Sequence, residues 1–117
     1  MNIIQEALPD QIYRIVPRGR LDAVTVPSLE TVIDEHLNAG HVRLIIDLAE
    51  VTYISSSGLR TLLHARRQTQ AGGGEVVLCS MSERVTEVFD MIGFNSLFRI
   101  FPRAPEAAAA LAQVTAA

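Results

Sequence analysis

Three consecutive serines followed by a glycine form the most concentrated chemistry in the chain: Ser55, Ser56, Ser57 and Gly58. They come after residues 51–54, a run typical of a short strand, and before leucines at helical spacing. The first N–H groups of a helix have no intrahelical partners, and the helix dipole makes that end partly positive. A phosphate on a serine there gains hydrogen bonds and a favourable field. The cluster is therefore suited to carry a phosphoserine without unfolding.

Two other roles have to be weighed for the same serines. A serine at a helix start commonly caps it, which contributes about 1 kcal/mol, and on spacing alone capping is the more frequent role. A serine hydrolase would need a Gly-x-Ser-x-Gly turn with a histidine and an acid. That turn is absent from the sequence, and no other catalytic set is visible, so we expect no enzyme activity. Spacing leaves capping and phosphorylation both open.

The remaining reactive side chains are scattered. His36, His41 and His64 do not form a metal-ligand pattern with Cys or Asp, so we predict no metal site and expect these histidines to be solvent-exposed. Cys79 follows an apolar run and is predicted to be an inert, packed thiol. The glycines at 72–74 lack the lysine of a phosphate-binding loop and indicate a helix stop. We predict no cofactor.

Composition excludes several classes of partner. The net charge is −3, all ten basic residues are arginine without local concentration, and aromatic residues make up 5%, so nucleic-acid binding is not expected. The apolar runs are too short for membrane insertion, and the first residues lack the pattern of a signal peptide. A single cysteine fits a reducing compartment. We expect a cytoplasmic protein that is monomeric when free.

Strand-like and helix-like segments alternate along the chain. Strands are predicted at residues 2–7, 12–16, 43–48, 51–54, 75–79 and 97–101, the first two joined by a turn. Four helices are predicted: one capped by Thr25 and ended by Gly40, one from the serines to Ala71, one capped by Ser80 and ended by Gly93, and one from Pro105 through Leu111. Their expected inner faces include Val26, Leu29, Ile33 and Leu37, then Leu59, Leu62 and Leu63, then Val85, Val88, Phe89 and Ile92.

This order predicts the α/β fold class. Three consecutive aliphatic residues at 44–46 indicate a strand buried on both faces, as in parallel sheets. We expect one domain over residues 1–117, with a mixed, mostly parallel sheet, an N-terminal antiparallel hairpin and about four helices. Residues 107–117 would be a C-terminal helix prone to fraying.

The segment from Asp47 to Arg60 resembles the signature of the STAS domain family, in particular the anti-sigma-factor antagonists. An Asp-Leu pair opens it, and an aromatic-aliphatic pair precedes the Ser-Ser-Gly-Leu turn. Residues 19–22 with Thr25, residues 85–94 and residues 97–101 resemble further parts of that family in the same order. The resemblance covers nearly the whole chain and implies a single STAS-like domain.

The resemblance also assigns roles to residues. It implies that the phosphate acceptor is Ser56, two places before the motif glycine. Ser55 and Ser57 are the alternatives, because Ser55 stands where the family often has Asp. The implied partner surface around the acceptor is formed by Asp22, Ser55, Ser57, Gly58 and Arg60.

Some of these residues suit plainer roles as well. Asp22 would equally suit a loop of the Asx type. Arg60 lies along one side of its helix with His64 and Arg67, which would also fit a solvated face. Asp47 is interpreted mainly as an anchor for the loop after its strand.

The mechanism implied by the resemblance is a partner switch. The unphosphorylated protein would bind an anti-sigma-factor serine kinase and release a sigma factor, phosphorylation at Ser56 would end that binding, and a PP2C-type phosphatase would reset it. The alternative is a STAS subunit of a lipid or anion transport system, or a sensory scaffold, without a phospho-switch.

Overall fold

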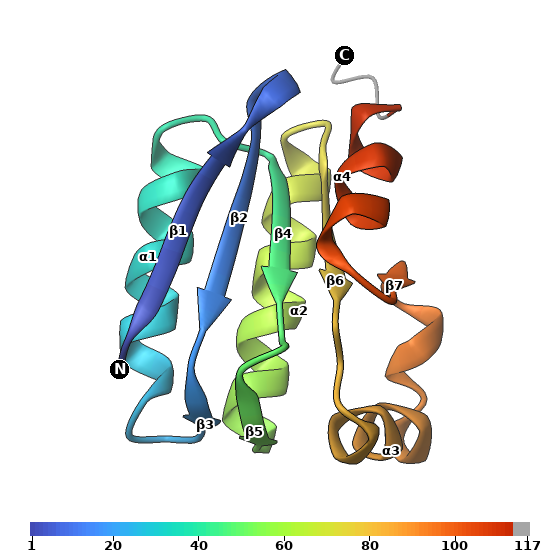
Figure 1. Cartoon of the computed structure of the whole chain (residues 1–117). Coiled ribbons are helices and arrows are strands. Elements are labelled where there is room, and N and C mark those ends of the chain that lie inside the picture. Colours follow the sequence, from blue (N-terminus) through green and yellow to red (C-terminus); the bar gives the residue numbers. More distant parts are fainter. Residues whose placement is uncertain (114–117) are drawn as a thin grey trace.

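A five-stranded sheet forms the centre of the molecule, with helices on both of its faces (Figure 1). The computed structural model describes residues 1–113; residues 114–117, the end of the segment predicted to fray, lie outside the described part. In chain order the elements are β1 (Ile3–Leu8), a 3-10 turn (Pro9–Gln11), β2 (Ile12–Pro17), β3 (Gly19–Leu21), α1 (Val26–Asn38), β4 (Arg43–Asp47), β5 (Val51–Ile54), α2 (Ser56–Ala71), β6 (Glu75–Cys79), α3 (Glu83–Ile92), a second 3-10 turn (Phe94–Ser96), β7 (Ile100–Phe101) and α4 (Ala104–Ala112).

The sheet has the strand order β1-β2-β4-β6-β7. Strands β1 and β2 form an antiparallel hairpin, and all later neighbours in the sheet are parallel. Strands β3 and β5 pair in parallel as a separate two-stranded sheet at the lower end in Figure 1. The predicted α/β class, with its N-terminal hairpin, mostly parallel sheet and four helices, is confirmed.

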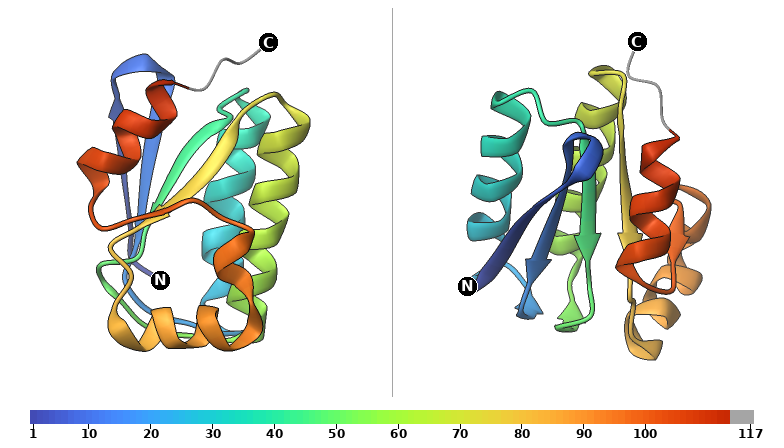
Figure 2. Two further views of the ribbon diagram at one scale, coloured as in Figure 1. Left: turned by 90° about the vertical axis from the view of Figure 1, so that its right-hand side faces the viewer. Right: turned by 45° about the horizontal axis from the view of Figure 1, so that its top comes forward.

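Helices α1 and α2 cover one face of the sheet and α4 covers part of the other (Figure 2). Leu44 and Ile46 of β4 pack into the cluster formed with α1, α2 and α3, whereas Ile45 packs on the other side with residues of α4. All three side chains are fully buried, so the aliphatic run at 44–46 does mark a strand buried on both faces.

Two elements differ from the sequence-based expectation. Residues 19–21 form β3, where no strand was predicted; the strand has three residues and begins at a glycine with φ +94°, so it is too short to show an alternating pattern. The strand predicted at 97–101 is limited to Ile100–Phe101, because the 3-10 turn occupies Phe94–Ser96 and the chain becomes extended only after it.

The start and end of α3 also differ from the prediction. The helix is capped by Ser82, whose hydroxyl accepts the N–H of Val85 at 3.2 Å, whereas Ser80 lies outside it with φ +61°. Ile92, predicted to face inward, is 45% exposed; the left-handed Gly93 ends the helix directly after it. Val85 and Phe89 form the inner face as predicted.

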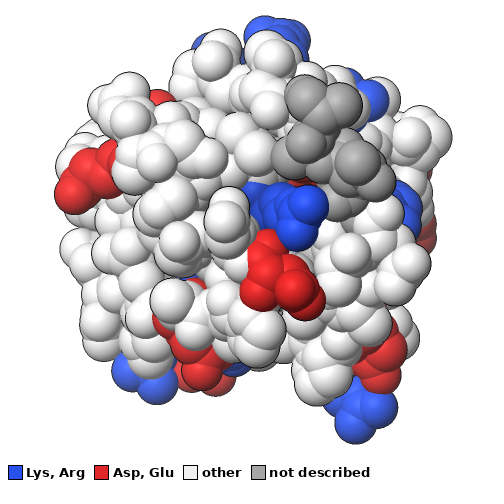
Figure 3. Space-filling view, turned by 90° about the horizontal axis from the view of Figure 1, so that it is seen from above, with Lys and Arg blue, Asp and Glu red and all other residues white. Residues whose placement is uncertain are grey.

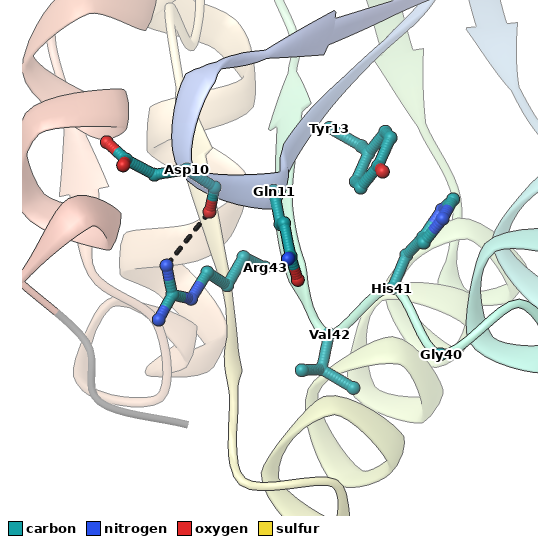
Figure 4. A pocket seen from close by; sticks show the side chains of 7 residues that line it. All are labelled: Asp10, Gln11, Tyr13, Gly40, His41, Val42 and Arg43. Carbon is teal, nitrogen blue, oxygen red and sulfur yellow. Dashed lines mark hydrogen bonds between the residues drawn. The ribbon is translucent and has the colours of Figure 1, made fainter. Parts of the chain in front are cut away.

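His36 is buried against expectation, with 9% of its surface exposed, while His64 is exposed as predicted. The imidazole Nε2 of His36 lies 2.8 Å from Oε1 of Gln5, and its Nδ1 lies 2.9 Å from Nδ1 of His41. Tyr13 stacks on the His41 ring at 3.7 Å, and these two rings are drawn side by side in Figure 4.

A neutral His36 with its proton on Nε2 satisfies both contacts, with His41 donating from Nδ1. The helical spacing to Leu29 and Ile33 could have revealed this inner position.

The buried histidine predicts a pH dependence of stability. Burial, and then the charge of His41, lower the pKa of His36, with Glu35 acting in the opposite direction. Near pH ~6.5 the unfolded chain takes up a proton that the folded chain resists, so the free energy of unfolding falls as the pH drops through this range. In urea unfolding between about pH 7.5 and about pH 5.5, wild type should lose more stability than His36→Gln. The control variant His64→Gln changes an exposed histidine, and its free energy of unfolding should depend on pH as in wild type. If His36→Gln lost as much stability as wild type over this pH range, the assignment to His36 would be wrong.

Candidate functional site

The serine turn lies at the carboxyl-terminal end of the parallel strands, at the lower end of the molecule in Figure 1. Strand β5 ends at Ile54 and α2 begins at Ser56, so a single residue, Ser55, joins them. The N–H of Ser55 donates to the carbonyl of Leu21 at 2.8 Å, which ties the turn to β3. This edge of an α/β sheet is where such folds usually place their functional residues.

The three serines have different environments. Ser55 is the N-cap of α2: its hydroxyl accepts the N–H of Gly58 at 3.4 Å, and its carbonyl accepts the N–H of Leu59 at 3.0 Å. Ser57 is half-buried. Ser56 is exposed, and within residues 1–113 its hydroxyl makes no hydrogen bond. The capping serine, Ser55, and the serine with the exposed hydroxyl, Ser56, are therefore different residues, which the spacing alone did not show.

Gly58 allows the first turn of α2 to pack closely on the two short strands. A Cβ at this position would lie 2.9 Å from Cγ1 of Ile54 and 3.1 Å from Cβ of Leu21. Contacts this short would push α2 away from β3 and β5. The glycine of the motif thus has a packing role that keeps the serine turn in place.

Asp22 stabilises the loop that leads into α1. Its Oδ1 accepts the N–H of Val24 at 3.0 Å and that of Thr25 at 3.2 Å. The Thr25 N–H, followed by the Val24 N–H and Arg20, lowers the pKa of Asp22. Thr25 was expected to cap α1, but its hydroxyl instead donates to the carbonyl of Arg20 and accepts the N–H of Asp22 at 3.0 Å. Asp22 therefore has an Asx-type structural role, and its contact with a partner stays a prediction.

The surface beside the serine turn contains apolar residues that the sequence did not single out. Val24 is 87% exposed and Met91 is 84% exposed. The guanidinium of Arg20 lies 4.2 Å from the centre of the Tyr53 ring. Tyr53 and Met91 line a shallow groove of about 290 Å³ between β5 and α3. Met91 could have been found from the helical pattern, because it lies two residues after the buried Phe89 and so on the outer side of the helix.

Asp47 and Arg60, the other residues singled out in this segment, occupy very different positions. Asp47 is buried at the end of β4; its Oδ1 accepts the N–H of Ala49 at 3.0 Å and its Oδ2 lies 2.8 Å from Nη2 of Arg14. It therefore anchors the loop after its strand. Arg60 is exposed on α2, one helical turn after Ser56.

A cavity of about 400 Å³ lies at the opposite end of the molecule, where the parallel strands begin. Figure 4 shows its seven lining residues, and the Nη1 of Arg43 donates to the carbonyl of Asp10 across it at 2.9 Å. Seen from this end, the surface carries scattered charges of both signs among uncharged residues (Figure 3). Nothing in this arrangement matches the chemistry of the serine turn, so we do not place the functional site there.

The described residues do not support a metal site or a reactive thiol. Among residues 1–113, no group of three or more His, Cys, Asp and Glu side chains is placed to hold a metal ion. Cys79 is buried, and burial raises its pKa to about 11, so its thiol stays protonated and unreactive at neutral pH. No helix within the described residues is long and apolar enough to cross a membrane.

Comparisons with known proteins agree on one family. Residues 5–107 match the family model of the STAS domain. BtrV of Bordetella bronchiseptica, a candidate anti-sigma factor antagonist, is 36% identical over 93 residues, which cover 80% of each chain. A candidate antagonist from Thermotoga maritima has a similar structure, with a TM-score of 0.87 at 22% identity over 93% of each chain. The phosphorylated form of the Bacillus cell fate determinant SpoIIAA has a TM-score of 0.74 at 21% identity, over 93% of this chain and 98% of that one. The two solved structures show that the fold is shared.

Proposed function

Because the chain belongs to the STAS domain family, and within it to the non-enzymatic anti-sigma factor antagonists, we propose that it is a phospho-switch whose acceptor is Ser56. In this proposal the unphosphorylated protein binds an anti-sigma-factor serine kinase and so releases a sigma factor. Phosphorylation ends that binding, and a PP2C-type phosphatase restores it. The switch operates in the cytoplasm, and the free protein is a monomer.

The observation that carries the proposal is the position of the Ser56 hydroxyl. It is exposed, makes no hydrogen bond within residues 1–113, and belongs to the first residue of α2. A phosphate at that position adds a charge of about −1.5 to −2 beside the positive end of the helix dipole. The fold can accept this charge, whereas modification of Ser55 would disturb the cap on Gly58.

The chemistry is an ordinary phosphoryl transfer in which this chain is the substrate. The hydroxyl oxygen of Ser56 forms a bond to the γ-phosphorus of the kinase's Mg-ATP, the bond from that phosphorus to the β,γ-bridging oxygen breaks, and ADP leaves. A base on the kinase takes the hydroxyl proton. The new phosphate then opposes binding through charge repulsion and the cost of desolvation at a closely fitted surface.

The acceptor can be tested with a panel of single serine variants. The wild-type chain is used to recover its kinase from native cytosol, the recovered kinase is supplied with Mg-ATP, and the modified residue is mapped by mass spectrometry. We expect one phosphate on Ser56 in wild type, Ser55→Ala and Ser57→Ala, and none in Ser56→Ala. Phosphate on Ser55 or Ser57 in wild type would contradict the assignment. Recovery of a transporter ATPase, with no phosphate on any serine, would favour the transport-subunit alternative.

A further inference from the structure

Arg60 is an exposed cation that nothing holds in place. Within residues 1–113 its guanidinium has no hydrogen bond and no ion pair. Two arginines near it on this end of the molecule are engaged: Arg18 lies 3.7 Å from Glu50, and Arg20 lies over Tyr53. Arg60 is therefore available for a new contact.

Arg60 lies beside a carboxylate with which it does not pair. It lines a hollow of about 370 Å³ between the first turns of α1 and α2, together with Glu30 and Ser57. Glu30 is the one carboxylate among the lining residues, and its Oε1 accepts the hydroxyl of Thr61 at 3.2 Å. This carboxylate contacts Thr61 through one of its two oxygens and does not pair with Arg60.

We propose that a phosphate on Ser56 captures Arg60 in an ion pair along α2. Residues four apart on a helix lie on the same side, with Cβ atoms about 5–6 Å apart, which the long arginine side chain spans easily. The order is the favourable one, with the anion nearer the helix start and the cation after it. The planar guanidinium can also donate two parallel hydrogen bonds to a phosphate. The inference rests on the proposed function only for the presence of the phosphate.

The ion pair would change the partner surface in two ways at once. Phosphorylation adds negative charge at Ser56, and it also withdraws the positive charge of Arg60 from any acidic group on the partner. A single modification would then alter two neighbouring contacts. This makes Arg60 a positioning residue of the switch that responds to the state of Ser56.

The test uses the full chain with phosphoserine installed at position 56 by genetic encoding, so that no kinase is needed. A pH titration followed by phosphorus NMR gives the second pKa of the phosphate, ordinarily about 6. A neighbouring cation favours the dianion and lowers that pKa, so Arg60→Gln should raise it by about 0.3 pH unit or more. Arg60→Lys should restore most of the lowering, because the charge is retained.

Arg67→Gln is the matched control. Arg67 is on the same side of α2, is exposed and is also unpaired within residues 1–113. It lies eleven residues after Ser56, about 16 Å along the helix, and at that distance salt screens the interaction. Its variant should titrate like wild type. Identical titrations for wild type and Arg60→Gln would overturn the proposal, and so would equal shifts for both variants. If the kinase experiment fails while Arg60→Gln shifts the titration, the ion pair stands and only the proposed function falls.

Discussion

Ser56→Asp is expected to weaken binding to the anti-sigma factor at least about 100-fold, because a fixed negative charge at a closely fitted surface costs several kcal/mol. Ser56→Ala should bind as tightly as wild type, since the exposed hydroxyl makes no hydrogen bond within residues 1–113 that its removal could disturb. Isothermal titration calorimetry with the purified anti-sigma factor and each full-length variant measures the difference directly.

Ser56→Asn separates charge from shape, because asparagine has the size of aspartate without its charge. It should retain most of the wild-type affinity. The thermal unfolding midpoint of Ser56→Asp should not fall, since an acidic residue in the first turn of α2 is favoured by the helix dipole. Tight binding by Ser56→Asp would refute the switch, and an equal loss in Ser56→Asn would show that bulk, not charge, disturbs the surface.

Arg14→Met is expected to lower the free energy of unfolding by about 3 kcal/mol, because it leaves a buried carboxylate without its cation. Asp47 is 2% exposed, and Arg14 contacts its Oδ2 through both Nε and Nη2, at 2.9 Å and 2.8 Å. Burial acts to lower the pKa of Arg14, but the hydrogen bonds and charges of Asp47 and Glu6 outweigh it and the pKa is raised. Methionine keeps the apolar stem of the side chain, so urea unfolding reports mainly the lost charge.

Arg18→Met is the exposed counterpart of this change. Arg18 and Glu50 are both about half-exposed at 3.7 Å, and such surface pairs contribute at most about 1 kcal/mol. The double variant Arg14→Met with Asp47→Asn should recover much of the loss, because it removes the buried charge while the amide oxygen can still accept the N–H of Ala49. If Arg14→Met and Arg18→Met lowered the free energy of unfolding by the same small amount, the buried carboxylate of Asp47 would not need Arg14 as its counter-charge, contrary to what its contacts indicate.

The main strands and the fold class could be predicted because they depend on local patterns. β4 and β6 contain runs of aliphatic residues that only a strand covered on both faces can bury, and glycine marks the end of α3 at a left-handed residue. The cap of α3 was predicted at the wrong serine because Ser80 and Ser82 both precede an acidic first turn. Only the left-handed backbone of Ser80 rules out Ser80 as the cap. Local pattern does not encode that difference.

The site could be predicted only in part. The sequence placed three hydroxyls at a helix start, but which one caps and which one is exposed depends on how Ser55 is held by Leu21 of a distant strand. The pairing of Arg20 with Tyr53 likewise joins β3 to β5, which no local window contains. Helical spacing could have placed His36 on the inner side of α1, but its contact with Gln5 of the hairpin joins residues far apart in the sequence.

The hydrogen bond from Ser55 to Leu21 bears on when the serine turn forms during synthesis. β3 leaves the ribosome long before β5, with the whole of α1 and β4 between them, so the serine turn cannot close while the chain is still short. Contacts of this sequence separation form late, because the loop between them must first be ordered. A kinase that recognises the closed turn would ignore nascent and misfolded chains. Under the proposed function, only molecules that have completed their core would then be phosphorylated and affect the amount of free sigma factor.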